Sequence, residues 1–134
     1  MIYVTRRAAF SASHRLYNPQ LSSEENIALF DKCANEMGHG HNYVLEVTVA
    51  GEPDEKSGYV IDLKKLKEIL KREILDKVDH KHLNHDVEFL RGVIPTAENV
   101  AKAFWRVLQP HITDGKLYSI RLHETENNAV EYRG

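Results

Sequence analysis

Residues 41–50 alternate apolar and polar side chains, and this pattern constrains the fold of the chain more than any other feature. A period of two places neighbouring side chains on opposite faces of a strand, with one face in the core and the other polar. The apolar side chains share the parity of His41, and the polar ones have the other parity: Tyr43, Leu45, Val47 and Val49 against Asn42, Glu46 and Thr48. We therefore expect a sheet that is covered on one face only.

The remaining elements follow from β-prone segments and from two helix start signals. Asp62 and Thr96 each precede an apolar stripe at helical spacing, so we expect each of them to cap a helix. Further strands are expected at residues 2–14, 116–124 and 129–133. The order β-β-α-α-β-β predicts an α+β fold, in which a four-stranded antiparallel sheet carries both helices on one face. The open edges of such a sheet favour association with further copies.

Three connecting segments carry more specific signals. Residues 17–38 are expected to form a long loop that holds a short helical turn. Residues 59–61 are β-branched or aromatic, which is typical of a short strand. Asn127 and Asn128 are expected to join the last two strands in a tight hairpin, because Asn tolerates the positive φ that such a turn needs.

Composition excludes several classes of protein. The chain has 134 residues, a net charge of −2 and a single cysteine, and no repeat or linker divides it, so we expect one domain over residues 1–134. The acidic balance argues against nucleic acid or an anionic membrane as a partner, and no apolar run reaches the ~18 residues of a membrane span. No stretch resembles a signal peptide and a free thiol suits a reducing compartment, so we expect a cytoplasmic protein.

Three histidines are spaced so that they can converge on one metal ion. His39 and His41 are two residues apart, so both imidazoles leave the same face of an extended segment. His14 ends the first expected strand, and pairing of that strand with the next would bring it beside the other two. Three imidazoles suit a divalent ion of the zinc type and leave one coordination position open for chemistry.

Cys33 and the Asp79–His80 pair are the candidate proton-transfer groups. Cys33 lies six residues before His39 among neighbours that are not core-like, so we interpret its thiol as a reactive group beside the metal. Asp79 can orient His80 and stabilise its cationic form. The same loop contains an alternative metal-binding group, which lacks a second element to complete the site: His80, His82 and His85.

Seven short motifs follow one another across nearly the whole chain. They are FSASHRLY, EEN, KC, GHGHNY, DHK, TAENVA and ETENN-V-YRG. In their order and spacing the chain resembles the 6-pyruvoyltetrahydropterin synthase family. The five residues between Cys33 and His39 resemble the animal-type enzymes more than the bacterial branch, which makes 6-carboxytetrahydropterin for the 7-deazaguanine (queuosine) route.

The resemblance implies a fold, an assembly and a reaction. The fold is the tunnelling fold (T-fold), in which two trimers, each a twelve-stranded antiparallel barrel, stack as a homohexamer. The reaction is that of a lyase, which converts 7,8-dihydroneopterin triphosphate to 6-pyruvoyltetrahydropterin and eliminates triphosphate. The implied cofactor is a zinc ion, Zn2+, held by three residues: His14, His39 and His41.

The resemblance also assigns roles to single residues. It implies Cys33 as the proton-transferring thiolate, with Asp79 and His80 as a second acid/base pair that approaches from a neighbouring subunit. Glu124 corresponds to the carboxylate that accepts hydrogen bonds from the pterin N–H groups. Thr96 matches a threonine near the pterin.

Other functions stay open at this point. Formation of 6-carboxytetrahydropterin from the same substrate is the close alternative. The pattern His39-x-His41-x4-Glu46 superficially resembles a cupin metal motif, although the alternation sends Glu46 to the other face of the strand. A non-catalytic metal- or pterin-binding module is the third possibility. No motif marks a triphosphate pocket, for which Arg15 and Lys32 are candidates by position alone.

Overall fold

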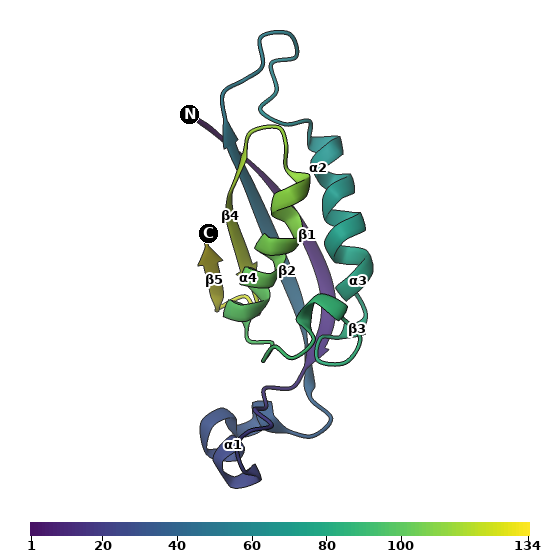
Figure 1. Ribbon diagram of the computed structural model, residues 1–134, viewed down its shortest axis with the longest axis vertical. Helices are drawn as coiled ribbons and strands as arrows, with labels where there is room; N and C mark the ends of the chain where they lie inside the picture. The colour runs from purple at the N-terminus through teal and green to yellow at the C-terminus, as the bar shows by residue number, and fades with distance from the viewer.

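Figure 1 shows the computed structural model, which describes all 134 residues. Its sheet has five strands in the order β3-β1-β2-β4-β5. Neighbours run antiparallel except for β3, which lies parallel to β1. The expected α+β class is confirmed, but the sheet has one strand more than the four expected. The strands are β1 (Ile2–His14), β2 (His39–Gly51), β3 (Lys81–His82), β4 (Lys116–His123) and β5 (Ala129–Tyr132).

The additional strand, β3, forms because the loop after the first covering helix returns along the outer edge of β1. The Ser11 carbonyl accepts the His80 N–H at 2.6 Å, and the Ser13 carbonyl accepts the Leu83 N–H at 2.7 Å. These bonds hold the two intervening residues in extended geometry. A strand of two residues has no alternation from which it could be predicted.

The hairpin of β1 and β2 is the frame of the molecule. Its pairing runs from Ile2 opposite Gly51 to His14 opposite His39 without a break in register. The buried side chains of both strands leave the same face, as the alternation predicted. Because the register is continuous, the last residue of β1 is fixed against the first residue of β2.

Two helical segments cover one face of the sheet, and α1 lies beyond the end of the β1–β2 hairpin (Figure 1). The Asp62 and Thr96 side chains accept backbone N–H groups of the first turn, at 2.9 and 3.2 Å, so both predicted caps are confirmed. The α2, η2 and α3 elements form one continuous segment with a π-helical turn at η2. The helices are α1 (Ser23–Phe30), η1 (Asp31–Ala34), α2 (Leu63–Leu70), η2 (Lys71–Leu75), α3 (Asp76–Val78), η3 (Glu88–Leu90), α4 (Ala97–Leu108) and η4 (Gln109–His111).

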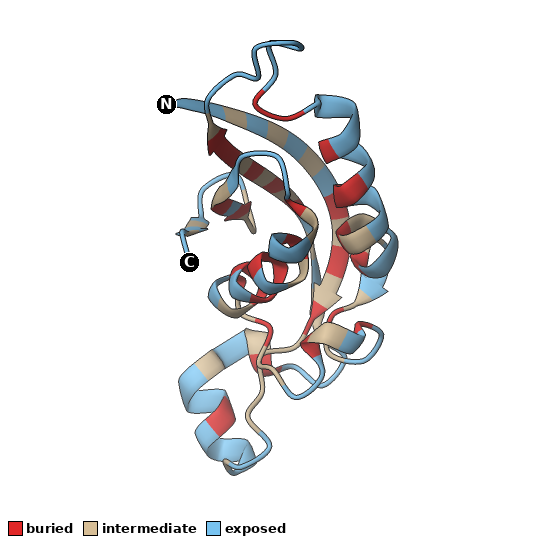
Figure 2. Cartoon of the chain, turned by 45° about the horizontal axis from the view of Figure 1, so that its top comes forward, coloured by how far each residue is buried: buried red, intermediate tan, exposed pale blue.

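A core of 26 buried residues lies between the sheet and the covering helices, as Figure 2 shows by the position of the buried residues. The opposite face of the sheet is polar, and its side chains bond across the strands. The Thr5 and Thr48 hydroxyls lie 2.7 Å apart, and the Ser11 hydroxyl donates to Asn42 at 2.7 Å. The sheet is therefore covered on one face only. None of the helices combines the length and the apolar character that crossing a bilayer requires.

The expectation of a strand at residues 59–61 is wrong. The Tyr59 carbonyl accepts the Asp54 N–H at 2.9 Å and closes a local turn. Val60 and Ile61 then bury their side chains in the core without joining the ladder. The apolar composition of this segment indicates that the Val60 and Ile61 side chains are buried. It does not distinguish a strand from an extended loop, because both can be buried.

The expectation of positive φ in the last hairpin is also wrong. Neither Asn127 nor Asn128 has a positive φ. The strands are joined by a five-residue loop, residues 124–128, rather than a two-residue turn, so no left-handed residue is required. Instead, the Thr125 hydroxyl accepts the N–H groups of both asparagines at 3.1 and 3.2 Å.

Candidate metal centre and active site

Three histidines meet where β1 ends and β2 begins. The register places His14 opposite His39, and His41 follows on the same face of β2. A ring nitrogen of each residue lies within 4.8 Å of those of the other two. His14 is only 1% exposed, and the other two are half-buried. The predicted convergence is therefore confirmed, and these side chains are positioned to hold a metal ion.

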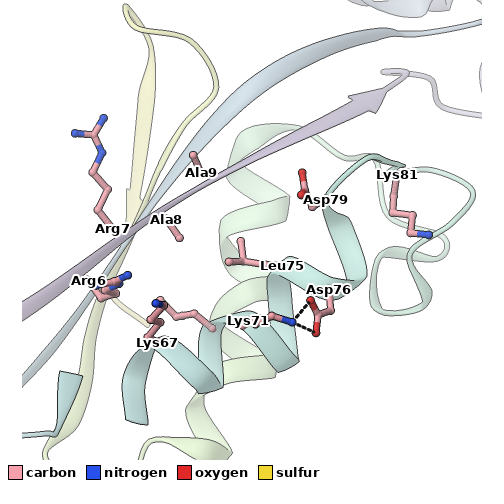
Figure 3. Close-up of a pocket in the computed structure, with 11 residues that line it drawn as sticks. Arg6, Arg7, Ala8, Ala9, Lys67, Lys71, Leu75, Asp76, Asp79 and Lys81 are labelled. Atoms are coloured by element: carbon pink, nitrogen blue, oxygen red, sulfur yellow. Dashed lines mark hydrogen bonds and ion pairs between the residues drawn. The ribbon is translucent and has the colours of Figure 1, made fainter. Parts of the chain in front are cut away.

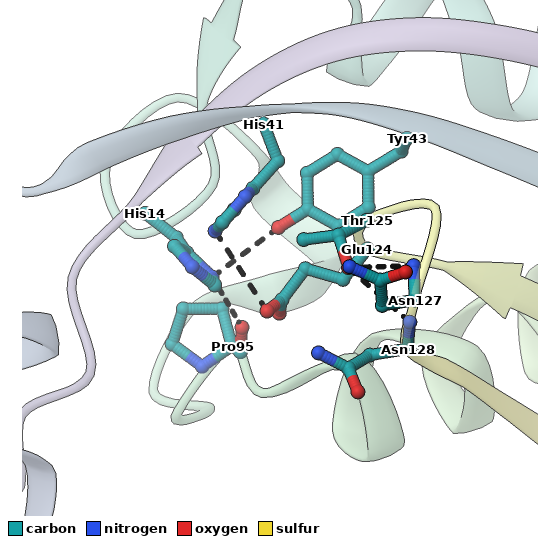
Figure 4. A network of polar contacts seen from close by, with 8 residues as sticks. All are labelled: His14, His41, Tyr43, Pro95, Glu124, Thr125, Asn127 and Asn128. Carbon is teal, nitrogen blue, oxygen red and sulfur yellow. Dashed lines mark hydrogen bonds and ion pairs between the residues drawn. The ribbon is translucent and has the colours of Figure 1, made fainter.

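A hydrogen bond fixes which nitrogen of His14 faces the cluster (Figure 4). Nδ1 lies 2.8 Å from the Pro95 carbonyl oxygen, and because a carbonyl only accepts, Nδ1 carries the proton. The Nε2 atoms of His14 and His41 are buried and have no hydrogen-bond partner. An unsatisfied buried group costs ~1–3 kcal/mol. A metal ion bound to these lone pairs would remove that cost, so the donor set fits a divalent metal.

Burial also favours the metal-binding protonation state of His14 and His41. Desolvation is the main cause that lowers the pKa of His14 and of His41 below the ordinary value of 6.5. Glu124 acts against this shift, because its carboxylate lies 3.8 Å from His41 Nε2. The desolvation prevails, and neutral imidazole is the ligating form.

Tyr43 adds a hydroxyl to this site that the sequence analysis treated only as part of the core. Its oxygen lies 3.3 Å from His14 Nδ1, and the residue is fully buried. Burial, and after it the Glu124 carboxylate, raises the pKa of Tyr43 above its ordinary value of 10.0, so the phenol stays protonated. Because Tyr43 lies two residues after His41 on the same strand, the alternation could have placed its side chain near the cluster. The contact of the Pro95 carbonyl could not be predicted in this way, because every residue has a backbone carbonyl.

Cys33 lies on η1, in a turn that hydrogen bonds attach to the end of β1. The Leu16 N–H donates to the Cys33 carbonyl at 2.7 Å. The thiol is half-buried and free, and its sulfur is not part of the group of ligand atoms that the three histidines form. The thiol therefore lies outside the ligand group, and its predicted place beside the metal remains a prediction.

Gly38 brings the cysteine-bearing segment back onto the cluster. Its φ is +74°, in the region that favours glycine, and a Cβ atom there would lie 2.5 Å from the His14 carbonyl oxygen. No side chain fits such an approach. The glycine that precedes His39 is therefore required by the backbone of the opposite ligand.

Asp79 and His80 lie on the outer edge of β1. Asp79 Oδ1 accepts the Ser11 N–H at 2.9 Å and lies 3.1 Å from His80 Nδ1. The Ser11 hydrogen bond, followed by the interaction with His80, lowers the pKa of Asp79. His80 has a φ of +61°, which is rare outside glycine, and its side chain is 82% exposed. Asp79 is thus held in its ionised form by these contacts, and the pair is open to solvent.

A cleft of about 600 Å3 runs beside this edge, and Asp79 is part of its lining (Figure 3). Along it, the outer edge of β1, which faces away from β2, has no strand partner before Ala12. Asp76 is neutralised by Lys71 at 2.9 Å. The other charges in the lining are mostly basic: Arg6, Arg7, Lys67 and Lys81. The edge of the sheet is therefore open and cationic here.

Glu124 and Thr96 lie on the same side of the sheet as the cluster. Glu124 opens the β4–β5 loop and points toward His41, as Figure 4 shows. Thr96 caps α4, where its hydroxyl accepts the Asn99 N–H at 3.2 Å. Thr96 also follows Pro95, the residue that orients His14. The predicted binding roles of both residues remain predictions.

The alternative ligand sets do not assemble. Glu46 bonds to His123 on the polar face of the sheet, so the cupin-like pattern forms no site, as the alternation indicated. His82 and His85 stack with ring centroids 4.4 Å apart, and the structure brings no third ligand to them. The histidines of the β1–β2 hairpin remain the one candidate metal centre.

Comparison with known proteins agrees with this geometry. Residues 3–134 match the family model described as 6-pyruvoyl tetrahydropterin synthase. The 6-pyruvoyl tetrahydrobiopterin synthase of Pongo abelii is 50% identical over 98% of this chain and 90% of its own length. A solved structure of the Caenorhabditis elegans 6-pyruvoyl tetrahydropterin synthase is 42% identical, with a TM-score of 0.94 over 99% of this chain and 95% of the other. The 6-carboxy-5,6,7,8-tetrahydropterin synthase of Rickettsia felis is 32% identical over 98% of this chain and 99% of its own length. The resemblance noted in the sequence is thus confirmed, and the chain belongs to the 6-pyruvoyl tetrahydropterin synthase family.

Proposed function

We propose that this chain is a zinc-dependent lyase that converts 7,8-dihydroneopterin triphosphate to 6-pyruvoyltetrahydropterin and releases triphosphate. The observation that carries the proposal is a three-histidine cluster whose neighbouring turn bears the only cysteine of the chain. Family membership supports the reaction class, and the greater identity to a pyruvoyl-forming relative than to a carboxy-forming one supports the product.

Zinc fits the donor set because three neutral imidazoles leave a fourth position free. His14, His39 and His41 would hold it through ring nitrogens. At His14 and His41 the Nε2 atom has no hydrogen-bond partner in the protein. A zinc ion there would acidify the hydroxyl groups of the substrate side chain. Glu124, which lies on the same side of the sheet as the cluster, would accept hydrogen bonds from the pterin N–H groups and orient the ring toward the cluster.

The chain's own residues would move the protons. Cys33 would remove a proton from a side-chain carbon, and His80, oriented by Asp79, would exchange protons with oxygen. The reaction is internally redox-neutral, since the dihydropterin ring gains the two hydrogens that the side chain loses. The carbon–oxygen bond to triphosphate breaks in the same sequence of steps. No nicotinamide or flavin is needed.

A hexamer is part of the same proposal. The outer edges of β1 and β5 have no partner over most of their length. A second copy that added its β5 beside β1 would continue the sheet, and the four strands other than β3, taken from three copies, would make the twelve of a barrel. Because Asp79 occupies the β1 edge at Ser11, such pairing would end beside Asp79 and His80 and present them to a neighbouring copy.

Product analysis tests the activity. Zinc-loaded protein is incubated with 7,8-dihydroneopterin triphosphate, and the pterin is identified by mass spectrometry while released triphosphate is assayed. We expect 6-pyruvoyltetrahydropterin and one triphosphate per pterin. Acetaldehyde with a 6-carboxy product would establish the alternative, and metal-independent turnover would contradict the zinc assignment. Native mass spectrometry tests the assembly, with six times the chain mass of 15.4 kDa as the expected result.

A further inference from the structure

The backbone of Arg15, the residue after His14, is held on both sides by one side chain. Asn84 Oδ1 accepts the Arg15 N–H at 2.8 Å, and Asn84 Nδ2 donates to the Arg15 carbonyl at 2.8 Å. An amide that satisfies a donor and an acceptor of one residue fixes both its position and its direction. The loop that follows His80 is thereby joined to the end of β1.

The same short segment holds the cysteine turn. Arg15 Nε donates to the Ala34 carbonyl at 3.0 Å, and the Leu16 N–H donates to the Cys33 carbonyl at 2.7 Å. Two successive residues therefore bind two successive carbonyls. The guanidinium carbon also lies 3.9 Å from the centre of the Tyr17 ring, which restricts the orientation of the Arg15 side chain.

These contacts explain how a thiol on a separate turn can have a fixed place relative to the metal ligands. The Cys33 turn is not part of the sheet, so no ladder of strand hydrogen bonds connects it to the hairpin. The close approach of Gly38 to the His14 carbonyl is a further contact between the two segments. A displacement of about 1 Å in a reacting group can cost ~10²-fold in rate. The hydrogen bonds of Arg15 are suited to prevent it.

We propose that Arg15 and Asn84 are positioning residues that hold the Cys33 thiol at a set distance from the metal bound by the three histidines. The inference rests on the proposed role of Cys33. It gives Arg15 a different task from the triphosphate contact that its sequence position suggested, because its Nε–H and one face of its guanidinium are already engaged inside the protein.

Three variants test the proposal. Asn84→Ala removes both bonds to Arg15, and Asn84→Asp keeps only the acceptor. Arg15→Lys keeps the positive charge but removes the planar Nε–H donor. Arg91→Ala is the control, because it removes an arginine whose ion pair with Glu88, at 2.8 Å, lies on the surface outside this network.

The first readout needs no pterin chemistry. Cys33 is the only cysteine, so iodoacetamide alkylation followed by mass spectrometry reports this thiol alone. In the unmodified protein we expect added zinc to accelerate alkylation several-fold at fixed pH, because a nearby cation favours the thiolate. In Asn84→Ala and Arg15→Lys this ratio should fall close to one, while zinc content stays unchanged. The Arg91→Ala ratio should equal that of the unmodified protein.

The second readout is turnover. We expect kcat to fall by ~10–100-fold in Asn84→Ala and Arg15→Lys, with KM changed less than about twofold and a smaller loss in Asn84→Asp. Full activity in Arg15→Lys would overturn the proposal, because charge alone would then suffice. A zinc-dependent alkylation ratio that is one in the unmodified protein, or unaltered in the variants, would also overturn it. If Asn84→Ala fails to fold, Arg15→Lys and Asn84→Asp decide the same question. Failure of the proposed function would appear separately, as absent triphosphate release in a protein whose thiol still responds to zinc.

Discussion

The candidate metal ligands and the proposed proton-transfer groups are positioned in two different ways. His14, His39 and His41 belong to paired strands, and one continuous register places them. Cys33 lies on a short helical turn, and His80 lies at a strand edge with a left-handed backbone. The histidines that are positioned to hold an ion are thus part of the rigid ladder. The residues to which we assign proton exchange are attached to this ladder by a few specific hydrogen bonds.

The largest expected effect comes from breaking the ladder-based cluster. His39→Ala should abolish stoichiometric zinc binding and lower kcat/KM by ~10⁴-fold, since a metal contributes several kcal/mol to such chemistry. Metal analysis and triphosphate release measure the two effects. His123→Ala is the matched control, because His123 is also partly buried but faces the opposite side of the sheet. Retention of zinc by His39→Ala would contradict the assigned ligand set.

Removing the thiol should lower turnover without changing metal binding. Cys33→Ala is expected to lower triphosphate release by roughly 10³-fold, the scale of a lost general acid–base group. Zinc content should stay at the level of the unmodified protein, because the sulfur is not among the ligand atoms. Unchanged turnover would rule out the assigned role, and loss of zinc would make the thiol a ligand.

Two glycine substitutions test the contact between the Cys33 turn and the β1–β2 hairpin. Gly38 and Gly58 have nearly equal φ values of +74° and +76°, but only Gly38 has a close neighbour, the His14 carbonyl. Gly58→Ala should therefore cost ~1 kcal/mol of unfolding free energy from strain alone, and Gly38→Ala a further ~1–3 kcal/mol. Urea denaturation at fixed protein concentration measures both losses. Equal losses would show that the approach to His14 does not matter.

The smallest effect concerns Asp79, whose pKa is lowered in the folded state by the Ser11 N–H and by His80. A lowered folded pKa adds stability above the ordinary value of 3.8, and this contribution disappears as the pH falls through the folded pKa. Asp79→Asn removes this dependence, so its urea midpoint should fall less steeply between about pH 5 and pH 2. Superimposable pH profiles would contradict the expectation.

The sequence was sufficient for the parts of the molecule that depend on periodic patterns. Alternation predicted the buried face of β2, and parity placed His41 with Tyr43 and away from Glu46. Side-chain caps were equally readable at Asp62 and Thr96, because their hydroxyl or carboxylate serves the adjacent backbone. In each case the residue that carries the signal also makes the contact.

The rest depended on backbone groups that meet across long sequence separations. The proton on His14 is fixed by the carbonyl of Pro95, 81 residues away, and any residue type supplies a carbonyl. The strand β3 exists because the Ser11 and Ser13 carbonyls were free at an edge. The loop between β4 and β5 is held by the Thr125 hydroxyl, and the presence of two asparagines did not indicate its length.

The left-handed backbone at His80 has a consequence for protein engineering. A non-glycine residue in this conformation costs about 1–3 kcal/mol, so a search for heat-resistant variants would select His80→Gly early. The same exchange removes the imidazole that Asp79 orients. Given the proton-transfer role proposed for His80, tolerance of high temperature and turnover would then change in opposite directions at one position, and a library screened for melting temperature alone would accumulate inactive protein.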